Sequence, residues 1–129
     1  MNYDQSIYWR IGEIPSPTTI ISQEHQQINL YELMPTFVLT VPLCLNDTVE
    51  RVFPGGTFMS LLQMIHEFYQ EPVTSEELNR IMNLSAFKRN RMITLIERQE
   101  AGEIIRRINI VGGSATFEGI RNNLLLVDM

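Results

Sequence analysis

The cationic side chains that could do chemistry lie in one stretch of the chain, between positions 80 and 107. Seven of the ten basic residues fall there: Arg80, Lys88, Arg89, Arg91, Arg98, Arg106 and Arg107. The same stretch contains three carboxylates, so its net charge is +4. Residues 1–79 contain ten carboxylates and two arginines, a net charge of −8. Folding does not require such segregation, and it creates a field that attracts partners of opposite sign. We therefore predict that the seven residues form a basic interaction patch.

Two classes of partner fit this patch. Nine of the ten cations are arginines, whose planar guanidinium groups bind carboxylates and phosphates at two points. An acidic protein surface, such as residues 1–79 of a second copy, is one partner, and the phosphates of a nucleic acid are the other. Phe87 is the only aromatic residue in the stretch, which argues against base stacking, and the pI of about 5.0 argues against nucleic-acid binding. The first hypothesis is a non-enzymatic binding or structural protein that associates with itself, as a dimer, or with another protein. Nucleic-acid binding is the alternative.

Catalysis has the weakest support in the sequence. The chain contains two histidines, His25 and His66, and neither has a ligand-like partner three or four residues away. Its one cysteine, Cys44, could pair with His66 as nucleophile and base, but its context is not typical of a reactive cysteine. Glycine-rich phosphate loops and the Gly-x-Ser-x-Gly elbow are absent. A small enzyme is thus a second alternative, and we expect no catalytic residue, metal, cofactor or small-molecule ligand.

Composition indicates one globular domain over residues 1–129. The chain is 44% hydrophobic and 19% charged, which is ordinary for such a domain. A single cysteine excludes an internal disulfide and suits a reducing compartment. The start lacks the pattern of a signal peptide, and no apolar run approaches the roughly 20 residues that span a bilayer. We expect a soluble intracellular protein that is neither secreted nor bound to membranes.

The N-terminal region is the least regular part. We predict an irregular arm over residues 1–35, laid on an α+β core that covers residues 36–129. Tyr8 and Trp9 would anchor the arm, and Pro15-Ser16-Pro17 would turn it. A short strand over residues 18–22 fits within it. Exchange of the arm between subunits is the less favoured alternative.

The core begins with a predicted hairpin over residues 36–53, in which apolar residues alternate on both sides of an Asn46-Asp47 turn. A helix then starts after Thr57, because its apolar residues recur at 3.6-residue spacing. These residues are Phe58, Leu61, Leu62, Ile65, Phe68 and Tyr69. Pro72 ends this helix, and Thr74 with Glu77 has the spacing of a capping box for a second.

Residues 86–101 predict a third helix, with Ser85 as its cap and Gly102 after its end. The remainder predicts a meander of strands over residues 104–111, 115–120 and 124–127. In that arrangement Glu118 would pair across a hairpin with Arg106 or Arg107. The predicted fold is therefore α+β: one domain in which about three helices pack on antiparallel hairpin and meander strands.

Two segments resemble a known group of proteins. Residues 57–78, TFMSLLQMIHEFYQEPVTSEEL, hold a helix that ends in an aromatic pair, a Gln-x-Pro break and a Thr-x-Glu-Glu restart. Residues 105–120, IRRINIVGGSATFEGI, hold a Phe-Glu-Gly strand motif. Both are similar to small uncharacterised proteins of large DNA viruses that infect amoebae, the marseillevirus group among them. The resemblance implies a viral protein in the virion or in the cytoplasm or nucleus of the infected cell, and it supplies no catalytic residues.

Overall fold

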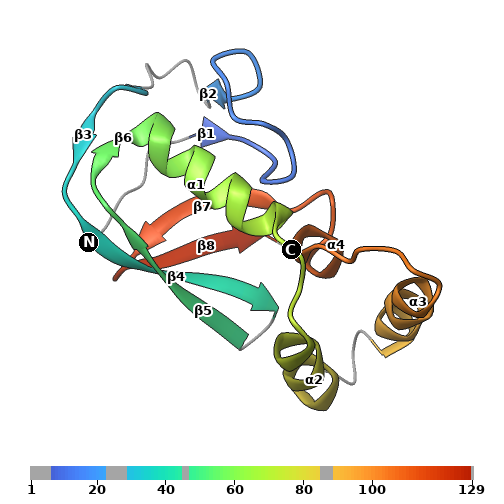
Figure 1. Cartoon of the computed structure of the whole chain (residues 1–129). Coiled ribbons are helices and arrows are strands. Elements are labelled where there is room, and N and C mark those ends of the chain that lie inside the picture. The colour runs from blue at the N-terminus through green and yellow to red at the C-terminus, as the bar shows by residue number, and fades with distance from the viewer. Residues whose placement is uncertain (1–6, 23–28, 45–46, 85–88, 129) are drawn as a thin grey trace.

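The computed structural model describes residues 7–22, 29–44, 47–84 and 89–128, and Figure 1 shows the path of the chain. These residues form a mixed α+β domain, which confirms the predicted fold class. Two hairpins supply the main sheet: β4 (Phe37–Cys44) with β5 (Asp47–Phe53), and β7 (Thr116–Arg121) with β8 (Leu124–Asp128). The strand order is β5-β4-β8-β7.

Both hairpins confirm strands predicted from alternation. Asn122 and Asn123 make the turn between β7 and β8 with φ angles of 52° and 61°, a conformation that asparagine tolerates better than most residues. Pro42 lies inside β4, at a position opposite Thr48 of β5. β8 joins β4 in parallel, with Thr40 opposite Leu124. The sheet is therefore mixed, not antiparallel throughout as predicted.

Helix α1 (Phe58–Gln70) lies across one face of this sheet (Figure 1). Thr57 caps it as predicted, because its hydroxyl accepts a hydrogen bond from the amide of Ser60 at 3.1 Å. All six apolar residues predicted for its buried face are buried. They pack with Leu39, Val41 and Phe117 of the sheet to form the larger core cluster.

A second, smaller core lies beside the end of β4, where Leu43 is fully buried. It is closed by α2 (Ser75–Leu84) and α3 (Arg89–Glu100) through Ile81 and Leu95. The predicted capping box at the start of α2 is present: the amide of Thr74 donates to the carboxylate of Glu77, and the amide of Glu77 donates to the hydroxyl of Thr74. The predicted start of α3 at residues 85–88 lies outside the described residues.

The predicted strand over residues 104–111 is wrong. Residues Arg107–Val111 form a short helix, α4, whose first turn begins where the side chain of Asn109 accepts a hydrogen bond from the amide of Arg106 at 2.9 Å. Ile110 packs into the smaller core and Val111 into the larger one, and Arg107 at the start of the helix reaches Glu77. β-branched composition favoured a strand locally, and packing overrides it. Gly112 ends the helix with a φ of 102°.

The N-terminal arm is more ordered than predicted. β1 (Ile7–Tyr8) pairs with β2 (Ile21–Ser22), which is shorter than the strand expected over residues 18–22, and β3 (Leu33–Met34) pairs with β6 (Gly56–Thr57). Trp9 anchors the arm, since it is fully buried, whereas Tyr8 remains exposed. No described helix is long and apolar enough to cross a membrane.

Candidate interaction site

Arg107, one of the seven residues of the predicted basic patch, is buried. Its side chain is 5% exposed, so it cannot contribute to a surface patch and that part of the prediction is wrong. Its guanidinium donates to the carboxylate of Glu77 from Nε at 3.2 Å and from Nη2 at 3.1 Å. It also donates to Glu71 and to the carbonyl of Phe68, and it stacks over the Phe68 ring at 4.3 Å. A buried guanidinium needs this degree of pairing.

The cluster around Arg107 fixes three helix ends relative to one another. Glu71 follows α1, Glu77 lies in the first turn of α2, and Arg107 begins α4. Burial acts to raise the pKa of Glu77, but hydrogen bonds from the amide of Thr74 and from Arg107 outweigh it, so the pKa lies below its ordinary value. Burial raises the pKa of Tyr69, although Arg107 opposes this, and its hydroxyl donates to a backbone carbonyl of β4. The cluster is thus a structural clamp.

The other described members of the predicted patch also have partners within the chain. Arg80 contacts Asp47 at 3.5 Å, and Arg98 contacts Glu103 at 2.5 Å. Arg106 donates to the carbonyl of Gln70 at 2.6 Å. The side chains of Lys88, Arg89 and Arg91 lie outside the described part of the chain. The four described members therefore do not form one surface of unpaired cations, and whether the rest bind a partner stays a prediction.

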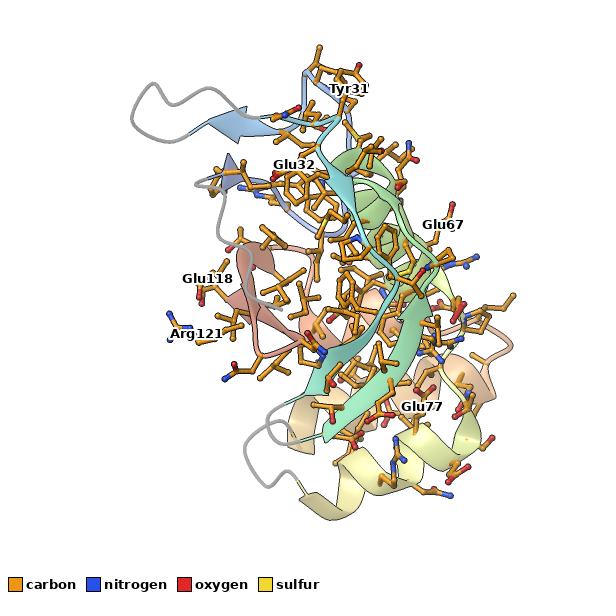
Figure 2. The ribbon with its side chains drawn as sticks, turned by 90° about the vertical axis from the view of Figure 1, so that its left-hand side faces the viewer. Tyr31, Glu32, Glu67, Glu77, Glu118 and Arg121 are labelled. Atoms are coloured by element: carbon orange, nitrogen blue, oxygen red, sulfur yellow. The ribbon has the colours of Figure 1, made fainter. Side chains whose placement is uncertain are left out.

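One further predicted contact differs from the structure. Glu118 pairs with neither Arg106 nor Arg107, because those arginines belong to α4 and its cap and not to a neighbouring strand. Figure 2 shows Glu118 projecting from the β7 side of the molecule, well apart from Glu77. His66 bonds the carbonyl of Ile11 at 3.0 Å through Nδ1. This bond joins α1 to the N-terminal arm and gives His66 a structural role, whereas the side chain of Cys44 lies outside the description.

A shallow pocket of about 200 Å³ lies between α1 and the β4–β5 hairpin. Arg51 lines it and donates to Glu71 at 2.8 Å, while its guanidinium lies 5.4 Å from the centre of the Phe68 ring. The charged residues of this pocket are an arginine that is already paired and two glutamates. Among the described residues, no serine, cysteine or histidine lines it. Within the described residues, no group of three acidic, histidine or cysteine side chains could hold a metal ion.

The two edges of the main sheet differ. At the β7 edge, the N-terminal arm runs alongside as an added strand. The amide of Phe117 donates to the carbonyl of Trp9 at 2.9 Å, the amide of Ile11 donates to Ala115 at 3.0 Å, and Arg10 bridges Thr116. This edge is therefore covered by the chain itself.

The β5 edge has backbone groups that point outward. The amide of Thr40 donates to Asn123 at 2.8 Å, on the side of β4 that faces away from β5. Glu50 is the partner of Thr40 in the β4–β5 register, so the amide and carbonyl of Glu50 also point away from β4. The same alternation turns the backbone groups of Thr48 and Val52 outward. No hydrogen bond within the described residues uses them.

Apolar side chains accompany this open edge. Val52 is 63% exposed, and Val38 opposite it on β4 is 43% exposed. An edge strand with unpaired donors and acceptors is a template for a strand from another chain. Sequence reasoning predicted the hairpin but not its open edge, because strand order depends on β8 docking against β4. Alternation in residues 48–53 gave the only signal.

Comparisons with known proteins returned no match: no protein-family model, curated protein or solved structure is significantly similar to the chain. Function is therefore inferred from the sheet edges and the ion pairs.

Proposed function

We propose that the chain is a non-enzymatic binding protein that associates with itself through the open β5 edge of its sheet. The observation that carries this proposal is the contrast between the edges. The chain covers its β7 edge with residues Trp9–Ile11 and leaves the amides and carbonyls of β5 facing outward. Main-chain pairing at such an edge supplies affinity without a dedicated pocket.

The position of the exposed valines supports the same surface. Val38 and Val52 form a cross-strand pair next to the edge, so a strand added to β5 would cover part of Val52. Each square ångström of apolar area that leaves water contributes about 25 cal/mol. The clamp around Arg107 holds α1 and α2 in place behind the hairpin, which keeps the edge rigid before association.

The biological setting of the proposal comes from the sequence. The resemblance of residues 57–78 and 105–120 to proteins of amoeba-infecting DNA viruses supports a component of the virion or of the infected cell. The pairing of Arg80, Arg98 and Arg107 with carboxylates argues against nucleic-acid binding.

Light scattering over a range of protein concentrations tests self-association. We expect a dimer that persists at high salt, because backbone hydrogen bonds and apolar contacts are screened far less than surface charges. Arg98→Ala is the matched control, since Arg98 belongs to the predicted basic patch and lies away from β5; its dimerisation should be unchanged. A chain that remains monomeric at every concentration would refute the proposal.

A further inference from the structure

We infer that two copies pair β5 with β5 in antiparallel orientation, about a two-fold axis at Val49. This inference rests on the proposed function and specifies its interface. Two-fold symmetry is the commonest arrangement of a homodimer, and it places one surface against itself. The pairing would join two four-stranded sheets into one continuous sheet.

The direction of the backbone groups limits the possible registers. In an antiparallel pair, directly opposite residues either exchange both backbone hydrogen bonds or exchange none. Only Thr48, Glu50 and Val52 direct their groups outward from β5. With the axis at Val49, Thr48 lies opposite Glu50 of the second copy. By symmetry, Glu50 lies opposite Thr48 of the second copy. Both pairs then exchange backbone hydrogen bonds. Between them, Val49 lies opposite Val49 of the second copy as a non-hydrogen-bonded pair.

Charge favours this register over those centred on Glu50 and Arg51. An axis at Val49 places Asp47 opposite Arg51 of the second copy, which are charges of opposite sign. An axis at Glu50 would oppose two glutamates, and an axis at Arg51 would oppose two arginines. Like charges directly across a sheet are destabilising, whereas opposite charges stabilise. Of these three registers, the one centred on Val49 alone is complementary.

Arg51 is the accessible one of these two charges, since the side chain of Asp47 is only 10% exposed. Asp47 holds Arg80 at the long distance of 3.5 Å, and Arg51 donates to Glu71 through Nη2 alone. Arg51 is 41% exposed at its side chain, so its guanidinium reaches solvent beside the edge. Val49 between them is partly buried against the core of its own chain.

A cysteine scan across the edge reads the register directly. Variants Val49→Cys, Glu50→Cys and Arg51→Cys are made in a Cys44→Ala background and oxidised under mild conditions. Residues facing each other at a non-bonded pair have Cα atoms about 4.5 Å apart, which a disulfide can bridge. The Cα atoms of residue 50 in the two copies would lie about 8 Å apart, which is farther than a disulfide can bridge. We expect the Val49→Cys variant to form covalent dimer at least about tenfold faster than the other two.

A proline variant tests the hydrogen bonds of the same edge. Glu50→Pro removes an amide that points outward, so it breaks the pairing between copies and no bond to β4. Glu50→Ala, which keeps the amide, is the control. We expect the proline variant to be monomeric with an unchanged circular dichroism spectrum, and the alanine variant to remain dimeric. If the proline variant fails to fold, the cysteine scan decides.

The outcomes separate this inference from the proposed function. Fastest crosslinking at position 50 or 51 would overturn the Val49 register. A dimer that crosslinks at none of the three positions, and that survives Glu50→Pro, would overturn the β5 interface while leaving self-association intact. A monomeric unmodified chain would overturn both.

Discussion

Glu77→Gln is expected to lower the free energy of unfolding by about 2–4 kcal/mol, because it removes the more buried of the two carboxylates that neutralise Arg107. Loss of one partner from a buried ion pair costs about 3–5 kcal/mol, and both side chains here are less than one-tenth exposed. Glu71 remains beside the guanidinium, so the expected loss is about 1 kcal/mol smaller than that range. Glutamine can still accept the hydrogen bond from the amide of Thr74, so the cap of α2 is retained.

Urea unfolding, followed by circular dichroism, measures this loss. Glu76→Gln is the matched control: it removes an exposed carboxylate from the same first turn of α2 and should cost at most about 1 kcal/mol through the helix dipole. The double variant Glu77→Gln with Arg107→Met should recover part of the stability, because no uncompensated charge is then buried. Equal unfolding free energies for the Glu77→Gln and Glu76→Gln variants would refute the clamp.

Three further perturbations follow from the geometry. Hydrogen bonds from Thr74 and Arg107 keep the pKa of Glu77 below its ordinary value of 4.5 against the opposing effect of burial, so the stability that this carboxylate contributes is present above pH 4.5 and is lost as pH falls through the folded pKa. Acid titration of unfolding should therefore be steeper for the natural chain than for Glu77→Gln, and identical slopes would contradict this. Thr57→Ala should cost about 1 kcal/mol in urea unfolding through loss of the α1 cap, and no change would exclude that role. Trp9→Ala should cost about 3–5 kcal/mol, because Trp9 is fully buried against the sheet, whereas Tyr8→Ala, at an exposed position, should have a small effect; equal losses would refute the anchoring role of Trp9.

Elements with local determinants were predictable from the sequence. Helix α1 has both a 3.6-residue apolar period and a capping threonine, and these act within a few residues of one another. The capping box of Thr74 and Glu77 is equally local. The turn at Asn122-Asn123 also depends only on residues that accept positive φ angles. In these cases the sequence pattern and the packing favour the same conformation.

Features determined over long sequence separations were not predictable. Residues 104–111 have strand composition, yet residues 107–111 form α4, in which Arg107 pairs with Glu77, 30 positions earlier in the chain, and Ile110 and Val111 enter different cores. The exposed basic patch was predicted from the number of charges along the sequence. Such a count cannot reveal which cations have carboxylate partners after folding. The open edge of β5 depends likewise on the order in which four strands assemble.

The position of β8 affects how the protein can fold as it is synthesised. β8 lies between β4 and β7, and it comes after every other described element along the chain. Until the ribosome has released β8, the inner side of β4 is free, and until it has released β7, residues Trp9–Ile11 have no strand to pair with. A nascent chain therefore holds one hairpin with both edges accessible, and a stop codon before β7 would leave the buried indole of Trp9 without the strand that covers it.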